Sequence, residues 1–161
     1  AATVFTCDYT ATSVLMNDGK GHFTIKALPP MAQISKVQGI IADDVNGDGH
    51  QDLIVAGNFY SYRTQMGRCD AGLGLVLLGD GKGNFIPQMP YQSGLYAGGD
   101  VRSLAVARTG AGGKLLILAK NNEATQVPRK ERETGSRRES ESNSALVIRK
   151  IRGWREIHPR K

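Results

Sequence analysis

Oxygen-bearing side chains recur along a short acidic loop from residue 44 to residue 52. Asp44, Asn46 and Asp48 occupy its positions 1, 3 and 5, Asp52 occupies position 9, and His50 at position 7 can add its backbone carbonyl. A Ca²⁺ ion takes about six to eight oxygen ligands, and water can complete the shell. Three carboxylates so close together would repel one another in an empty loop, so the spacing predicts one bound Ca²⁺. The plainer alternative is a polar turn that binds nothing.

The residues around these ligands favour a loop between two strands over an EF-hand. Gly47 and Gly49 lack a Cβ and let the backbone wind around an ion. An EF-hand places a bidentate Glu at position 12 and a helix on each side. Position 12 is Val55, and both flanks are apolar runs of strand length. Mg²⁺ fits less well, because it prefers a rigid octahedron with several waters.

A second group of candidate residues lies in the long connection at residues 59–70. Its aromatic and cationic side chains are typical of ligand-contacting loops, and the candidates are Tyr60, Tyr62, Arg63 and Arg68. The alternative is that the tyrosines only cover the neighbouring sheet. His22 and His50 have no nucleophile or companion base that the sequence identifies, so no catalytic residue is predicted.

Short β-strands must position these loops, because apolar runs of five or six residues alternate with Gly, Asp and Asn. Strands are predicted at 12–16, 22–26, 37–42, 52–57, 73–79, 84–87, 101–107 and 114–119. The turn Asp-Gly-Lys-Gly occurs at residues 18–21 and again at 80–83, an offset of 62. Its glycines suit the positive φ angles of a tight hairpin. A weaker match relates residues 37–42 to residues 101–106.

Four short strands in each unit are the pattern of a β-propeller blade. The predicted fold is therefore all-β, with blades of antiparallel four-stranded sheets that form a partial propeller over residues 1–125. One full blade spans about 37–87, between two half blades. Because closed propellers have about four to eight blades, the chain is expected to be part of a longer protein, to complete a ring by self-association, or to form an open sandwich.

The segment from Gly39 to Val55 resembles the FG-GAP/VCBS repeat, whose signature is an apolar strand, then D-x-[DN]-x-D-G-x-x-D, then a second apolar strand. The sequence Gly-Asp-Gly-Lys-Gly-Asn-Phe at 79–85 matches the GDGxGxF hairpin that closes such blades. The resemblance covers residues 12–122. It implies propeller blades whose loops are stiffened by calcium, like those of integrin α-subunits and of many secreted or surface bacterial proteins.

The chain departs from this family pattern in two places. At an offset of 64, the residues in the ligand positions of the next blade are Arg108, Gly110, Gly112 and Leu116. Only one calcium site is therefore expected. After Asn122, the third strand of that blade is replaced by a Ser, Arg and Glu-rich sequence, so the blade is expected to be truncated.

The excess positive charge is confined to the end of the chain. Residues 1–125 carry ten Lys/Arg and ten Asp/Glu, whereas residues 126–161, the basic tail, carry eleven Lys/Arg and five Glu, which accounts for the net charge of +6. The composition of the basic tail is typical of disordered chain, and attraction to a polyanion is the alternative. No specific nucleic-acid site is predicted. Cys7 and Cys69 fit no metal-binding spacing and are either paired or free.

These observations predict a non-catalytic, calcium-binding module that serves as a binding, adhesion or structural scaffold for a protein or glycan partner. An extracytoplasmic location is expected, since weak calcium sites can fill there. No membrane-spanning segment and no signal peptide is expected. The alternatives are a part of a propeller-based extracytoplasmic lyase or hydrolase, and a protein that binds polyanions through the basic tail.

Overall fold

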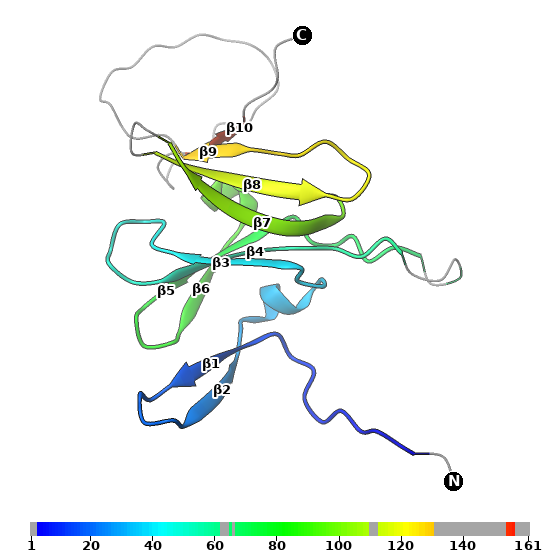
Figure 1. The fold of residues 1–161 in the computed structure, drawn as a ribbon, viewed down its shortest axis with the longest axis vertical. Helices are drawn as coiled ribbons and strands as arrows, with labels where there is room; N and C mark the ends of the chain where they lie inside the picture. Colours follow the sequence, from blue (N-terminus) through cyan, green and yellow to red (C-terminus); the bar gives the residue numbers. More distant parts are fainter. Residues whose placement is uncertain (1–2, 62–64, 66, 110–112, 131–153, 157–161) are drawn as a thin grey trace.

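The protein is mostly β-structure and is arranged in three antiparallel sheets (Figure 1). The computed structural model describes residues 3–61, 65, 67–109, 113–130 and 154–156. The first sheet pairs β1 (Ser13–Asn17) with β2 (Phe23–Ala27). The second sheet has the order β3-β4-β5-β6, with strands β3 (Gly39–Asp43), β4 (Asp52–Ala56), β5 (Leu75–Gly79) and β6 (Phe85–Gln88). The third has the order β10-β9-β8-β7, with strands β7 (Val101–Arg108), β8 (Lys114–Lys120), β9 (Pro128–Lys130) and β10 (Trp154–Glu156).

All eight strands that the sequence predicts are present, each within two residues of its expected ends. The second sheet occupies the segment predicted as one four-stranded unit. Two short helices were not predicted, namely the 3-10 helix η1 (Pro30–Gln33) and the helix α1 (Pro90–Ser93). Each is only four residues long and begins with proline, whose fixed φ favours a first helical turn.

The third sheet continues beyond residue 125, where the body was predicted to end. Gln126 exchanges two backbone hydrogen bonds with Leu118, at 2.8 and 3.1 Å, and β9 then pairs with β8. The expectation that this sheet loses its third strand is therefore wrong. A proline and two cations in β9 lower the β-propensity of the segment, but proline is tolerated as the first residue of a strand. The rest of the basic tail, at 131–153 and 157–161, lies outside the described residues.

The second sheet lies between the other two (Figure 1). One face packs on the third sheet, whereas the face toward the first sheet is covered mainly by Leu28 and η1, with Val14 of β1 packed beside them. Successive side chains of a strand point to opposite faces, so Ile54 joins the core shared with the third sheet and Val55 joins the core on the other side. The core facing the first sheet has the buried residues Leu28, Ala32, Val55, Leu75 and Leu77. The core facing the third sheet has the buried residues Val45, Ile54, Ala56, Val76, Leu95, Ala97, Val101, Leu116 and Leu118.

The two Asp-Gly-Lys-Gly turns form hairpins with the same hydrogen bonds. In the β1–β2 turn, Asp18 Oδ1 accepts the N–H groups of Lys20 and His22 at 2.7 and 3.1 Å. In the β5–β6 turn, Asp80 Oδ1 accepts those of Lys82 and Asn84 at 2.7 and 3.0 Å. The glycines of both turns have φ between 71° and 91°, a region that side chains with a Cβ rarely adopt.

The two turn aspartates are expected to respond differently to loss of a side-chain donor. The Asn84 side chain, followed by the Asn84 and Lys82 backbone N–H groups, lowers the pKa of Asp80 from 3.8 to about 2. The backbone N–H of Lys20 is the largest cause that lowers the pKa of Asp18. In a carboxyl-carbon NMR titration, Asn84→Ala should therefore raise the pKa of Asp80 clearly, whereas His22→Ala should move that of Asp18 less.

The sign of the pH dependence follows from the lowered pKa of Asp80. The stabilisation from its ionised form is complete above about 3.8 and is lost as the pH falls toward about 2. Asn84→Ala should shift this loss to higher pH. An unchanged Asp80 titration in the variant would contradict the assigned cause.

Candidate metal site

The loop from residue 44 to residue 52 joins β3 to β4 and is wound by two glycines. Gly47 and Gly49 have φ of 83° and 86°, which only glycine adopts easily. Val45, at loop position 2, is buried in the core that faces the third sheet. This apolar anchor was not singled out in the sequence, although it is the one apolar residue within an otherwise polar loop.

The first three predicted ligands all accept hydrogen bonds from the backbone of the loop. Asp44 accepts the N–H groups of Gly47 and Gly49, at 2.6 and 2.9 Å. Asn46 Oδ1 accepts that of Asp48 at 3.0 Å, and Asp48 Oδ1 accepts that of His50 at 2.8 Å. Loop positions 1, 3 and 5 therefore direct their side-chain oxygens toward N–H groups of the same loop.

Asp52 differs from the other three predicted ligands because it is fully buried. Its Oδ2 accepts the N–H of Val45 at 2.9 Å, which closes the loop. Its Oδ1 accepts the N–H of Gly79 at 2.8 Å, which ties the loop to the end of β5. Asp52 thus fixes the loop to the second sheet.

The end of the loop lies very close to the β5–β6 hairpin. A Cβ added at Gly79 would lie 2.1 Å from the carbonyl oxygen of Gln51, and one added at Gly81 would lie 2.5 Å from the His50 ring. The glycine at position 79 is therefore required by the close approach of two backbones. The His50 side chain therefore lies against the hairpin.

The donor set of this loop fits a hard cation, since every predicted ligand offers oxygen. Within the described ranges, no three His, Cys, Asp or Glu side chains are gathered closely enough to hold a metal ion. In the observed conformation the carboxylates accept amide N–H groups instead, and Asn46 Nδ2 donates to Asp48 Oδ2 at 2.8 Å. Ca²⁺ binding would require Asn46 to present its oxygen and the carboxylates to reorient toward the ion.

Two of the four predicted ligand-contact residues, Tyr60 and Arg68, belong to the described part of the chain. Phe59 and Cys69 pair through backbone hydrogen bonds of 2.8 and 2.9 Å, so the connection leaves and re-enters the fold at neighbouring points. The guanidinium of Arg68 lies 4.8 Å from the centre of the half-buried Tyr60 ring. Burial, followed by the charges of Glu123 and Asp70, raises the pKa of Tyr60. Tyr62 and Arg63 lie outside the described residues.

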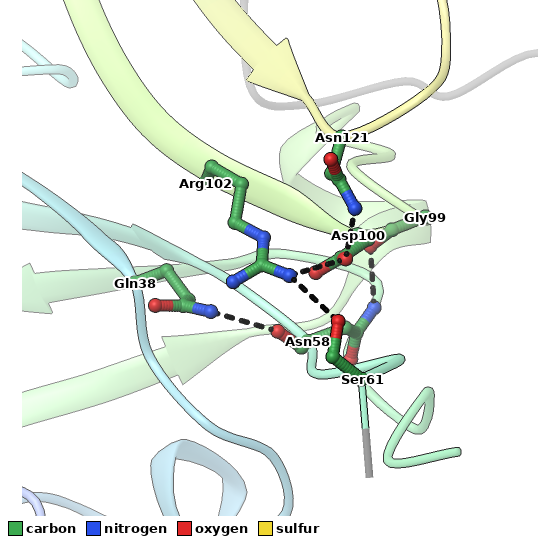
Figure 2. A network of polar contacts seen from close by, with 7 residues as sticks. All are labelled: Gln38, Asn58, Ser61, Gly99, Asp100, Arg102 and Asn121. Carbon is green, nitrogen blue, oxygen red and sulfur yellow. Dashed lines mark hydrogen bonds and ion pairs between the residues drawn. The ribbon is translucent and has the colours of Figure 1, made fainter.

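A buried polar network fixes the base of this connection and was not predicted (Figure 2). Asn58 is fully buried and donates to the carbonyls of Gly72 and Gly99, both at 2.8 Å. Its Oδ1 accepts the Ser35 hydroxyl at 2.7 Å and the Gly72 N–H at 2.9 Å. Every donor and acceptor of this side chain is therefore used.

An ion pair with a buried carboxylate, Asp100, and a partly exposed cation, Arg102, lies beside Asn58. Figure 2 shows Asp100 between Arg102 and Asn121, and Asp100 Oδ2 accepts from Arg102 at 2.8 Å and from Asn121 Nδ2 at 3.2 Å. Asp100 Oδ1 and Arg102 Nε have no hydrogen-bond partner within the described part of the chain. Two cations lie near the Phe59 ring, with Lys36 Nζ at 4.2 Å and the Arg102 guanidinium at 5.4 Å from its centre.

The remaining candidate residues lie apart from the loop. Cys7 and Cys69 are free and exposed. His22 Nδ1 lies 3.0 Å from Asp18 Oδ2 on an exposed turn, so this histidine does have a carboxylate partner. An apolar cavity of about 230 Å³ lies between η1, the ends of β4 and β5, and Met89. Leu116, which takes a ligand position in the next unit, is buried in β8.

Comparison with known proteins gives the chain no relative. No family model matches it, no curated protein matches it, and no solved structure matches it. Among the described residues, no helix has the length and apolar character needed to cross a membrane.

Proposed function

We propose that this chain is a non-catalytic, calcium-binding β-sheet module of the FG-GAP/VCBS kind, which serves as an extracytoplasmic binding or structural scaffold. The observation that carries the proposal is the loop at 44–52. Its oxygen donors occupy alternate positions of one wound loop between two strands, and its last carboxylate is buried against β5.

In this proposal, one Ca²⁺ is held by the side chains of Asp44, Asn46, Asp48 and Asp52 and by the carbonyl of His50. The ion supplies positive charge that offsets three neighbouring carboxylates. Because Asp52 also binds the N–H groups of Val45 and Gly79, a loop ordered by the ion braces the β3–β4 turn against β5. The ion is given a structural part and no part in a reaction.

The propeller part of the proposal is supported by the second sheet. It is a four-stranded antiparallel meander; one face packs on the third sheet, and the other is covered by Leu28, η1 and Val14 of β1. Radial sheets that pack face to face are the arrangement of propeller blades. Further sheets, from a longer chain or a second copy, would be needed to close a ring.

A ligand surface is proposed on the 59–70 connection, where Tyr60 and Arg68 stack. The Asn58 network holds the base of this connection rigidly against the carbonyls of Gly72 and Gly99. Rigid scaffolds that carry exposed loops are a common arrangement for binding. The expected partner is a protein or a glycan.

Calcium titration of the chelator-treated protein tests the metal proposal directly. Isothermal titration should show one saturable site, and Ca²⁺ should raise the melting temperature. Asp48→Ala should abolish both effects, because it removes one of the proposed ligands, and the hydrogen bonds it would break are bonds to Asn46 and His50 within the loop. Asp80→Ala is the matched control, since Asp80 is an equally exposed carboxylate in another glycine-rich turn. A folded protein that shows neither heat nor stabilisation would reduce the loop to a polar turn.

A further inference from the structure

The hairpins β1–β2 and β5–β6 have matching registers but different neighbours. Leu15 pairs with Ile25 and Asn17 with Phe23, as Leu77 pairs with Pro87 and Gly79 with Phe85. Strand β5 has β4 on its other side. Among the residues that the structure describes, no strand pairs with the corresponding side of β1.

The backbone groups along this open edge of β1 can be assigned from their counterparts in β5. Leu77 pairs with Leu53 of β4, and the N–H of Gly79 donates to Asp52 Oδ1. Backbone groups of successive residues in a strand point to alternate sides. The groups of Leu15 and Asn17 therefore point away from β2, into the position that β4 takes beside β5. The N–H of Asn17 lies where an incoming carboxylate can accept it.

Apolar side chains along this edge are also exposed to solvent. Leu15 and Phe23 are 64% and 60% exposed, whereas their counterparts Leu77 and Phe85 contribute to the core that faces the first sheet. Unpaired strand edges with apolar side chains are templates for strand addition. The partner that fits must be extended and antiparallel to β1, with apolar residues beside Leu15.

The segment that precedes β1 cannot supply this strand. In the β4–β5 register, Val55, three residues after Asp52, pairs with Leu75. Leu75 corresponds to Ser13 at the offset of 62, so the third residue after an aspartate that binds the edge of β1 would pair with Ser13. If Asp8 were this aspartate, residue 11 would pair with Ser13. Residue 12 alone would then remain to form the turn between the two strands. The tightest common hairpins need two. The strand must come from elsewhere.

We propose that the open edge of β1 binds an extended antiparallel strand that begins with an aspartate and continues with apolar residues. The aspartate accepts the N–H of Asn17, as Asp52 accepts that of Gly79, and the strand pairs with Leu15. This interaction is independent of the metal, because it uses none of the loop residues except as the pattern for the partner.

A peptide with the sequence of residues 50–57, flanked by lysines for solubility, is the probe. Titration into the full chain in chelator should show one site per chain, and amide exchange should slow at Leu15 and Asn17. The same peptide with Asp52→Ala should bind at least about tenfold more weakly, since a hydrogen bond to a charged acceptor is lost. Leu15→Pro in the protein should abolish binding, because proline removes the outward N–H but leaves the β1–β2 bonds of neighbouring residues.

Four results would overturn the proposal. The first is absence of binding to a protein shown to be folded. The second is equal binding of the two peptides. The third is slowed exchange at β5 or β6 in place of β1, which would mean that the peptide displaces the chain's own β4. Self-association through the β1 edge, seen as slowed exchange at Leu15 that grows with protein concentration alone, would also replace the proposed partner with a second copy.

Discussion

Asp52→Ala is expected to lower the free energy of unfolding by roughly 2–6 kcal/mol. It leaves two buried N–H groups without an acceptor, and each such unsatisfied group costs about 1–3 kcal/mol. These are the N–H groups of Val45 and Gly79. A small domain is stable by about 5–15 kcal/mol, so the variant should lie close to unfolding. Urea denaturation without calcium measures the change.

Two controls separate burial from charge at this position. Asp52→Asn keeps one acceptor oxygen and should fall between the wild type and the alanine variant. Asp80→Ala removes an exposed carboxylate that accepts turn N–H groups and should lower the urea midpoint less than Asp52→Ala does. If Asp52→Ala unfolds at the same urea concentration as the wild type, the link between the loop and β5 has no energetic weight.

The second large effect is expected at Asn58, whose side chain makes four hydrogen bonds in a fully buried position. Asn58→Leu removes all of them and leaves the carbonyls of Gly72 and Gly99 without these donors. The free energy of unfolding should fall by roughly 3–5 kcal/mol, because several buried polar groups lose their hydrogen-bond partners and the leucine side chain fits the site poorly. Urea denaturation again provides the measurement.

Limited proteolysis adds a local readout for the same variant. Because Asn58 joins residues 35, 72 and 99, its loss should expose the 59–70 connection to cleavage before the sheets unfold. Gln38→Ala is the matched control, since this half-buried side chain donates one bond of 3.2 Å to the Asn58 carbonyl. Cleavage of Asn58→Leu at the wild-type rate would show that other contacts hold the connection.

The strands and hairpins could be predicted because their signals are local. Short apolar runs bounded by Gly and Asp identify β3 and β4, and Asp-Gly-Lys-Gly fixes both hairpin turns through bonds that span no more than four residues. The candidate ligands were found for the same reason, since their spacing within nine residues is the whole signal. Which oxygen contacts which N–H group was not predictable, because Gly79 joins Asp52 across 27 positions.

The Asn58 network had no sequence signal, since its partners are residues 35, 72 and 99 and three of the four bonds involve backbone groups. Because every residue has backbone N–H and C=O groups, the sequence does not indicate which of them bind Asn58. The ion pair of Asp100 and Arg102 could have been suspected from their spacing of two, but only burial distinguishes Asp100 from an ordinary surface aspartate. Strand β9 was missed because tertiary pairing outweighed a poor local propensity.

The placement of the two cores on opposite faces of the second sheet has a mechanical consequence. If a force pulls the first sheet away from the third, the same force acts on both cores. The core on the side of the first sheet has five buried residues, none of them in β1 or β2, against nine in the core shared with the third sheet. Since less apolar surface is exposed when the smaller core opens, the first sheet should separate while the second and third stay joined. The loop at 44–52, which is anchored by Val45 in the larger core, should stay intact.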